Sequence, residues 1–136
     1  MEGKGGMHME IKIGMTGNAE ALVDSNNTAK AMGSGDLEVY ATPAMIALME
    51  KAATLAVAEY LSEGSSTVGT MINVKHIAAT PVGMNIAANA TLIKADGKRL
   101  LFTVEAFDGK NKIGEGQHER FIINVDKFLA RASGKK

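Results

Sequence analysis

Apolar and polar residues alternate near the start of the chain. Met9, Ile11 and Ile13 are apolar, and Glu10 and Lys12 between them are charged. A period of two residues is typical of a strand with one buried face. The sequence therefore predicts that the first strand begins here, within residues 9–23.

The connection at residues 24–37 has no such periodicity and is rich in Ser, Asn, Thr and Gly. This composition indicates an irregular loop, and loops held on a rigid scaffold often carry function. We expect this loop to be able to cover a site.

A long apolar helix is predicted from Thr42 to about Leu61. The Thr42 hydroxyl is suited to cap the first turn, Pro43 fits the first helical position, and Ser62-Glu63-Gly64 ends the pattern. Apolar side chains occur on nearly every side of this helix, which leaves little room for a polar stripe. The helix is therefore expected to be enclosed rather than to lie on a surface.

Strand patterns follow the helix and are separated by turn signals. In the first of them, His76 shares an apolar face with Val68, Thr70, Ile72, Val74 and Ala78, and Gly69 lies on the opposite face. Asp96-Gly97 is the strongest hairpin signal in the chain. One helix followed by antiparallel strands indicates an α+β fold, with a curved sheet around one long helix. The predicted elements are strands over Val68–Ala78, Met84–Ala95, Lys98–Phe107 and Lys112–Asn124, and a short helix from Asp126 to Ala132.

Composition mainly excludes classes of function. The 136 residues suit one domain, 1–136, and 15 basic residues balance 15 acidic ones, so no nucleic-acid partner is expected. There is no cysteine, and His8, His76 and His118 have no metal-ligand spacing, so no metal site is expected. Residues 1–13 contain no apolar segment of a signal peptide, and no stretch is long enough to span a membrane. We expect a cytoplasmic protein with no membrane partner.

Glu50 is the residue whose placement most needs an explanation. It lies within the apolar helix, where an unpaired dry carboxylate costs several kcal/mol, roughly the range for buried polar groups. It could face water or pair with Lys51 or Lys75. It could instead be functional.

Several motifs in order resemble a known family. They are Val39-Tyr40-Ala41-Thr42-Pro43, Met49-Glu50-Lys51-Ala52, Val68-Gly69-Thr70, His76-Ile77-Ala78-Ala79-Thr80-Pro81-Val82-Gly83 and Gly114-Glu115-Gly116-Gln117-His118-Glu119-Arg120. Over about Val39 to Asn124 the chain resembles the hot-dog-fold acyl-CoA thioesterases of the fluoroacetyl-CoA thioesterase type. The resemblance implies a curved antiparallel sheet wrapped around one long central helix, a homodimer, an acyl-CoA substrate and no separate cofactor.

The resemblance also implies the site residues. Thr42, Glu50 and His76 match the catalytic positions, Gly69 would lie near the thioester oxygen, and Arg120 would order the pocket. Thioester hydrolysis needs a nucleophile or activated water, a proton carrier and donors for the developing oxyanion. Glu50 could be nucleophile or general base, His76 could pass a proton to the CoA thiolate, and Thr42 could position water.

The distance along the helix limits how these residues can meet. Thr42 and Glu50 are eight residues apart, so their Cα atoms lie roughly 12 Å apart at 1.5 Å per residue. Either substrate, water and His76 span this gap within one chain, or a second subunit completes the site. We favour the shared site, because the family places its substrate channel at the subunit boundary.

Each of these residues also has a purely structural explanation. Thr42 could be only a helix cap, His76 only a core histidine with one hydrogen bond, and Gly69 a strand bulge. His118 and Arg120 share a strand face and could form a polar cluster between strands. The lysines and arginine near two hairpins could meet CoA phosphates or simply be solvated: Lys94, Lys98, Arg99, Lys110 and Lys112.

The substrate prediction comes from the segment before Thr42. The fluoroacetyl-specific enzyme has bulky aromatics there, whereas residues 30–37 of this chain contain no phenylalanine. A looser lid excludes water less well, so a short or medium acyl group is expected rather than a fluorinated one. Two alternatives are a non-catalytic acyl-CoA or small-ligand binding module on the same fold and a hydratase acting on an enoyl thioester.

Overall fold

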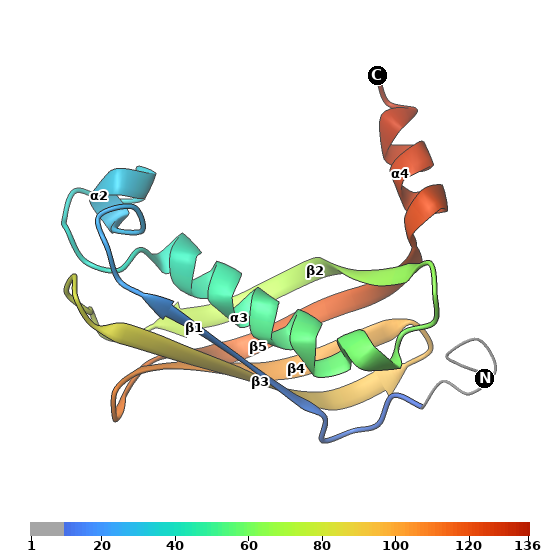
Figure 1. The fold of residues 1–136 in the computed structure, drawn as a ribbon, viewed down its shortest axis with the longest axis horizontal. Coiled ribbons are helices and arrows are strands. Elements are labelled where there is room, and N and C mark those ends of the chain that lie inside the picture. Colours follow the sequence, from blue (N-terminus) through green and yellow to red (C-terminus); the bar gives the residue numbers. More distant parts are fainter. Residues whose placement is uncertain (1–9) are drawn as a thin grey trace.

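A computed structural model describes residues 10–136, in which one long helix, α3, lies against a five-stranded antiparallel sheet (Figure 1). The strand order is β1-β3-β4-β5-β2, so β1 and β2 are the two edge strands. This arrangement confirms the α+β class and the curved sheet around one central helix. The elements are β1 Thr16–Leu22, α2 Ala29–Met32, α3 Thr42–Val57, a 3-10 turn Ala58–Tyr60, β2 Ser65–His76, β3 Asn85–Asp96, β4 Arg99–Asp108, β5 Asn111–Asn124 and α4 Val125–Ser133.

The four later strands agree with the hydrophobic pattern to within a few residues at each end. Asp96 pairs with Arg99 across the β3–β4 hairpin, and Gly97 adopts φ 63° in the turn, a left-handed conformation that favours glycine. The Asp96-Gly97 hairpin is therefore confirmed. The terminal helix is also confirmed, one residue longer at each end than predicted.

The first strand lies within the predicted range, residues 9–23, but begins after the alternating residues on which the prediction rested. Met9 lies outside the described residues, Ile13 is exposed in a turn, and β1 begins only at Thr16. Its inward residues are small: a Cβ at Gly17 would overlap the α3 backbone at Ala52. Small residues let strand and helix approach closely but leave only a weak hydrophobic pattern, which is why the earlier alternation was misleading.

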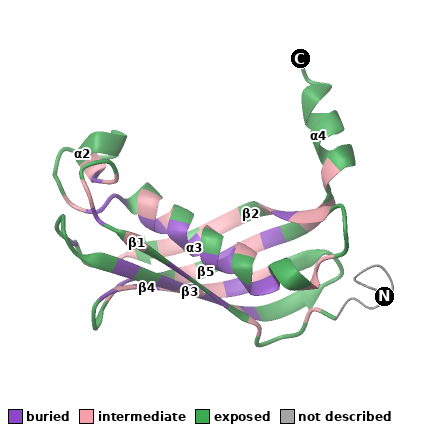
Figure 2. Cartoon of the chain, viewed as in Figure 1, coloured by how far each residue is buried: buried purple, intermediate pink, exposed green. Residues whose placement is uncertain are grey.

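Helix α3 is only half enclosed. One face packs on the sheet through Met45, Leu48, Met49, Ala52, Ala53, Ala56 and Val57 (Figure 2). The opposite face exposes Pro43, Ala47, Lys51 and Leu55, at spacings of four residues, and Leu55 retains 49% exposure. The prediction of full enclosure is therefore wrong for the single chain. The predicted end is nearly right, because the 3-10 turn continues α3 to Tyr60.

Two segments project from the sheet on the side of β2 (Figure 1). The loop before α3 contains the short helix α2, capped by the Thr28 hydroxyl, which accepts a hydrogen bond from the Ala31 amide at 3.1 Å. Helix α4 begins at the end of β5 and has no buried residue. Among the described helices, none has the length and apolar character needed to cross a membrane.

Candidate active site

Thr42 and His76 meet at one end of the molecule, where α3 begins and β2 ends. The Thr42 Oγ1 and His76 Nδ1 lie 2.8 Å apart and share a hydrogen bond. The predicted capping role of Thr42 is wrong, because Ala41 is the N-cap residue and no side chain caps this helix. Thr42 is the first residue inside the helix, so its hydroxyl is free to contact the histidine rather than the backbone.

A cavity of about 330 Å³ adjoins this pair. Burial raises the pKa of Tyr40 to about 12, so this residue lines the cavity as a neutral phenol. Burial also lowers the pKa of His76, an effect that the backbone of Ala78 partly opposes. Within the described residues, the buried His76 Nε2 has no hydrogen-bond partner. The cavity is lined by Ala29, Ser34, Val39, Tyr40, Thr42, His76, Ile77, Ala78 and Ala79.

A β-bulge in β2 determines which side chains face α3. The pairing of β2 with β5 shifts between Gly69 and Met71, leaving Thr70 as the extra residue. The bulge breaks the period of two, so Gly69 faces the helix, contrary to the predicted face assignment. Val68 and Thr70 therefore do not share a face with His76 as predicted. Because a single extra residue reverses the alternation, the periodicity of the sequence could not reveal it.

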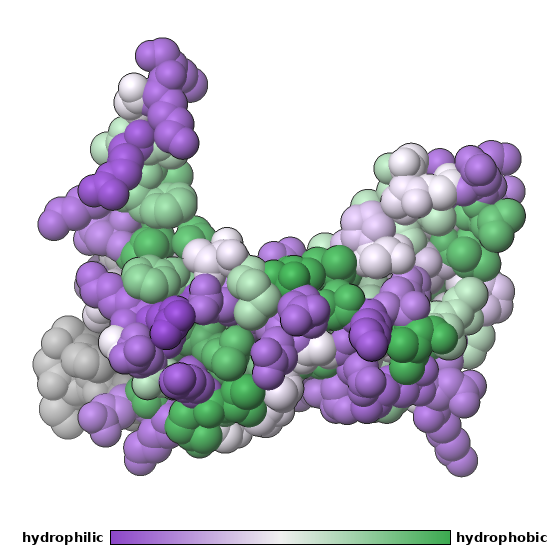
Figure 3. Space-filling model, turned by 180° about the vertical axis from the view of Figure 1, so that it is seen from behind, coloured by the Kyte–Doolittle hydropathy of each residue, from purple (hydrophilic) through white to green (hydrophobic). Residues whose placement is uncertain are grey.

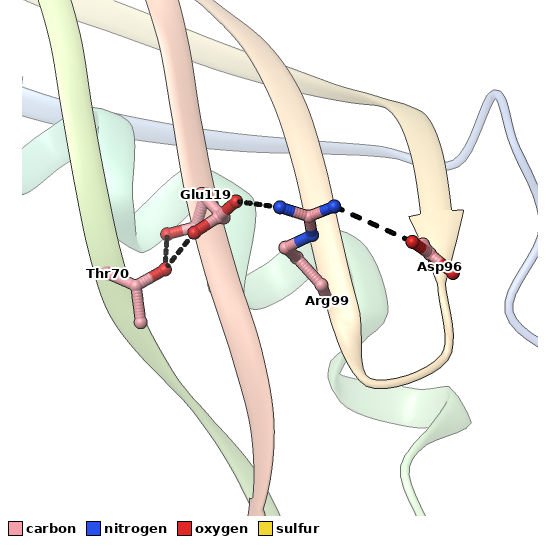
Figure 4. A network of polar contacts seen from close by, with 4 residues as sticks. All are labelled: Thr70, Asp96, Arg99 and Glu119. Atoms are coloured by element: carbon pink, nitrogen blue, oxygen red, sulfur yellow. Dashed lines mark hydrogen bonds and ion pairs between the residues drawn. The ribbon is translucent and has the colours of Figure 1, made fainter.

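A chain of polar contacts across the outer face of the sheet holds this bulge (Figure 4). The Thr70 hydroxyl donates to Glu119 Oε1 at 2.8 Å, and the other carboxylate oxygen of Glu119 lies 3.6 Å from Arg99 NH1. Arg99 also pairs with Asp96 at 3.5 Å. The contacts link β2, β5, β4 and β3, and so tie the bulged residue to the interior of the sheet.

On the inner side of the bulge, Glu50 meets Gly69, His118 and Arg120. A methyl group placed on Gly69 would lie 2.9 Å from Glu50 Oε2, 3.1 Å from His118 Cε1 and 3.3 Å from Arg120 NH1. Four residues from α3, β2 and β5 therefore surround one small space. The alternative in which Glu50 pairs with Lys51 or Lys75 is wrong, because Glu50 forms no ion pair within residues 10–136.

Arg120 is held in this space by two neighbours. Its Nε donates to the Thr67 hydroxyl at 2.8 Å and its NH2 donates to the Thr67 carbonyl at 2.9 Å. Burial lowers the pKa of Arg120, and the charge of Glu50 opposes this shift. The sequence had not indicated Thr67, since its contact with Arg120 depends on the unrecognised bulge.

His118 fixes the remaining nitrogen of Arg120. Its Nδ1 lies 2.8 Å from the Met71 carbonyl, which only accepts, so Nδ1 carries the proton and donates. Nε2 is then the acceptor for Arg120 NH1 at 3.1 Å. Burial lowers the pKa of His118, which keeps the ring neutral. The backbone of Met71 and the carboxylates of Glu50 and Glu119 oppose this shift, and the charge of Arg120 adds to it. The polar cluster predicted for His118 and Arg120 is confirmed.

Within one chain, the two groups of residues are separate. Gly69 and His76 lie seven positions apart on β2, so their Cα atoms are roughly 20 Å apart at about 3 Å per residue. The cavity beside His76 does not include Glu50. The structure thus brings Thr42 together with His76, and Glu50 together with Gly69 and Arg120, but does not bring the two pairs together.

The basic residues near the hairpins do not form the cluster that had been considered for CoA phosphates. Lys112 contacts Glu105 at 2.8 Å and Glu115 at 2.9 Å, and Arg99 is part of the contact chain on the outer face. Lys110 lies at the β4–β5 turn, at the opposite end of the sheet from Lys98. Within residues 10–136, no group of three or more His, Asp or Glu side chains is arranged to hold a metal ion; His8 lies outside this range.

Comparisons with known proteins found a matching family model and a curated relative. The model of the fluoroacetyl-CoA-specific thioesterase family matches residues 23–126. A curated relative, the fluoroacetyl-CoA thioesterase of Streptantibioticus cattleyicolor, is 45% identical over 98 residues, which are 72% of this chain and 70% of the relative. The similarity therefore extends over most of the described chain and includes both groups of residues.

Solved structures show the same fold. A structure of a fluoroacetyl-CoA thioesterase superposes with TM-score 0.88 and 35% identity, covering 94% of this chain and 99% of the other. A threonine-to-serine variant of a fluoroacetyl-CoA thioesterase in complex with acetyl-CoA gives TM-score 0.87 at 35% identity, covering 93% and 99%. A Thermus thermophilus member of the thioesterase superfamily gives TM-score 0.83 at 27% identity, covering 93% and 96%. The hot-dog fold is thereby confirmed.

Proposed function

The chain belongs to the fluoroacetyl-CoA-specific thioesterase family, and from that premise we propose that it hydrolyses short or medium acyl-CoA thioesters to the free acid and CoA. It is a thioester hydrolase, so the enoyl hydratase and the non-catalytic binding module are both disfavoured. CoA is part of the substrate, and the proposed chemistry uses no separate cofactor.

The observation that carries the proposal is the hydrogen bond between Thr42 and His76 beside a cavity. A hydroxyl that contacts an imidazole can orient water or substrate against a proton carrier. Burial keeps His76 neutral near neutral pH, since its pKa is lowered, and its unpartnered Nε2 has capacity for one more hydrogen bond. In the proposed reaction, this nitrogen donates a proton to the departing CoA sulfur.

The proposed reaction consumes one water molecule. Either water attacks the thioester carbon and gives its proton to Glu50, or Glu50 attacks first and water then hydrolyses the acylated carboxylate. In both cases the C–S bond breaks and the Nε2 of His76 gives its proton to the CoA sulfur. The proton lost by the attacking water then passes to His76 and restores the neutral ring. The Gly69 amide is the proposed donor to the carbonyl oxygen, because a residue without a side chain lets that oxygen approach the backbone.

We further propose that the site is shared between the two subunits of a homodimer. β2 is an edge strand, and two copies of β2 could pair antiparallel about a two-fold axis. An axis between Ile72 and Asn73 places His76 of one subunit opposite Gly69 of the other. That register joins the Thr42–His76 pair of one chain to Glu50 and Arg120 of its partner.

The proposed substrate range rests on the lid. None of the residues that line the cavity is a phenylalanine, and α2 contributes no buried residue to it. Met32 and Leu37 in the lid segment remain 46% and 68% exposed. Such a lid excludes water poorly, which favours a tolerant pocket over selection of a fluorinated acyl group.

A panel of acyl-CoAs tests the activity. Acetyl-, butyryl-, hexanoyl-, octanoyl- and fluoroacetyl-CoA are incubated with micromolar protein and a thiol-trapping reagent. Hydrolysis of the shorter members is expected, with no strong preference for fluoroacetyl-CoA over acetyl-CoA. No thiol release from any of them would contradict the proposal. Substituting Glu50→Ala should abolish turnover, and mass spectrometry of the trapped enzyme should reveal whether Glu50 becomes acylated.

Mixing two inactive variants tests the shared site. His76→Ala and Glu50→Ala chains are co-expressed, and mixed dimers then contain one site with both changes and one site with neither. For random pairing of symmetric dimers, activity should return to about a quarter of wild type. If each site belonged to one chain, mixing would restore nothing. A fully active monomer in size-exclusion chromatography would also rule out sharing.

A further inference from the structure

A buried carboxylate, Asp108, lies outside the two groups of site residues. Seen from behind, the surface of the molecule mixes hydrophilic and hydrophobic residues (Figure 3). Asp108, in contrast, ends β4 and is only 6% exposed, although an aspartate followed by glycine at a hairpin turn is normally exposed. Its Oδ2 accepts a hydrogen bond from the Thr80 hydroxyl at 2.6 Å, and Thr80 is fully buried. The pair joins the end of β4 to the connection between β2 and β3.

Stability alone does not explain this pair. Within residues 10–136, Asp108 forms no ion pair, and its buried Oδ1 has no hydrogen-bond partner. A carboxylate that exchanges its hydration for a single hydrogen bond is costly to bury. Exceptions of this kind are expected mainly at functional sites, where another gain offsets the cost. Asp108 is therefore a candidate for a role in the site.

Thr80 connects the two walls of the cavity that adjoins the proposed reacting pair. Its carbonyl accepts a hydrogen bond from the Tyr40 amide at 2.8 Å, and a β-bridge pairs Val39 with Pro81 directly after it. One wall of the cavity comes from the segment that leads into α3, and the other comes from residues 76–79. Both walls are therefore joined at Thr80.

The two side chains of the reacting pair lie close to this junction along the chain. Thr42 lies two residues beyond the amide that contacts Thr80, and His76 lies four residues before Thr80. The β2–β3 connection is held where it begins, because the Ile77 amide donates to a carbonyl of β5 at 2.7 Å. The bond from Thr80 to Asp108 holds it farther along, beyond the residues that line the cavity.

We propose that Asp108 is a positioning residue for the Thr42–His76 pair and acts through the Thr80 hydroxyl. This inference rests on the proposed function, in which His76 gives a proton to the departing sulfur. The end of β4 pairs with both β3 and β5, so the carboxylate is a fixed point for the cavity wall. Without the bond, the wall can move and the contact between Thr42 and His76 loses its geometry. A misplacement of about 1 Å at a reacting group can lower a rate by about 10²-fold.

Two substitutions of Thr80 separate the hydroxyl from the volume of the side chain. Thr80→Val replaces the hydroxyl with a methyl group of similar size, and Thr80→Ser keeps the donor. Thr80→Val should lower kcat for acetyl-CoA by about tenfold or more and change KM by less than about threefold, since the reacting groups are displaced. Thr80→Ser should keep kcat within about threefold of wild type, because its hydroxyl can still donate to Asp108.

Val57→Ala is the matched control for general destabilisation. Val57 is fully buried at the far end of α3 from Thr42, and its truncation leaves a cavity without breaking a polar contact. Like Thr80→Val, it should lower the melting temperature, but it should leave kcat near wild type at temperatures where the protein is folded.

Asp108→Asn tests the same bond from its other end. The amide keeps one oxygen that can accept from Thr80 but loses the charge that strengthens the bond. Its kcat should lie between those of wild type and Thr80→Val. This variant also provides the test if Thr80→Val does not fold.

Nuclear magnetic resonance of the histidine rings examines the geometry without catalysis. The chain has three histidines, and the variant His76→Gln identifies the signals of His76. Thr80→Val should shift the ring-nitrogen signals of His76, because its contact with Thr42 changes. The signals of His118, whose partners are Met71 and Arg120, should not move.

Three outcomes would overturn the inference. A wild-type kcat with unchanged His76 signals in Thr80→Val would show that the pair positions nothing. Equal losses of kcat in Thr80→Val and Val57→Ala would indicate general destabilisation, and equal losses in Thr80→Val and Thr80→Ser would exclude the hydroxyl as the link. If wild type hydrolyses no acyl-CoA, the proposed function itself has failed, whereas the ring signals still test whether Asp108 positions His76.

Discussion

Gly69→Ala should reduce catalysis far more than stability. The new methyl group would lie 2.9 Å from Glu50 Oε2, where an ordinary contact is about 3.4 Å, so the carboxylate must move by about 0.5 Å. Gly69 is not among the glycines with positive φ, so alanine causes no backbone strain. The nearest atom is the end of a flexible side chain, which can shift at low cost.

The expected magnitudes differ accordingly. Overpacking of this kind costs about 1 kcal/mol, since Glu50 is only half-buried and can yield. Catalysis is more sensitive, because displacing a reacting group by a fraction of an ångström and shielding the Gly69 amide should together lower kcat/KM by about 10²-fold.

The assay is steady-state hydrolysis of acetyl-CoA together with thermal melting. The comparison variant is Gly116→Ala on the neighbouring strand, whose Cβ would overlap the backbone of Asn73 and Val74 rather than a movable side chain. Gly116→Ala should lower the melting temperature strongly, whereas Gly69→Ala should lower it by less than about 5 °C. Full activity in Gly69→Ala would refute the placement of the substrate carbonyl beside this glycine, as would a loss of activity fully accounted for by unfolding.

Three further outcomes follow from the same contacts. Thr42→Ala should lower kcat but change the free energy of unfolding by less than about 0.5 kcal/mol, because Thr42 caps no amide. A loss of about 1 kcal/mol in urea titrations would instead support the capping role. Burial lowers the pKa of His76 and His118 below the ordinary value of 6.5, so below about pH 6.5 the unfolded state binds more protons than the folded state. The free energy of unfolding should therefore be full above that pH and fall as the pH decreases. Urea unfolding at several pH values should show this slope, and His118→Gln should flatten it. Arg120→Lys should lose both hydrogen bonds to Thr67 and lower the free energy of unfolding by about 2 kcal/mol, measured by thermal melting. Unchanged stability would show that a lysine can replace the guanidinium there.

The sequence predicted those parts of the fold whose signals are local. Pro43 and the apolar run after it mark α3, and Asp96-Gly97 marks a hairpin, because each depends on residues close in sequence. The start of β1 was misplaced, since Gly17 packs by close approach and provides almost no hydrophobic signal. The bulge at Thr70 was also invisible, because it depends on pairing with a strand about fifty residues later.

The candidate site shows the same division. The motif resemblance predicted Glu50, His76, Gly69 and Thr42 as site residues, although the local conformation predicted for Thr42 was wrong. Thr67 was missed, because its contact with Arg120 exists only once the bulge has turned Thr67 and Gly69 toward the helix. Residue types at motif positions could be read from the chain, but the partners that orient them depend on tertiary register.

The exposed stripe of α3 and the free edge of β2 favour the same assembly. A twelve-residue edge strand leaves a row of unpaired backbone groups, and Ile77, directly after it, is 52% exposed. Leu55 and its neighbours leave α3 partly uncovered on the side away from the sheet. Antiparallel pairing of two β2 strands would satisfy the backbone and bring two such helices side by side. The same contact would join the Thr42–His76 pair to a partner's Glu50, so the proposed symmetric interface would account for three features that the single chain leaves incomplete.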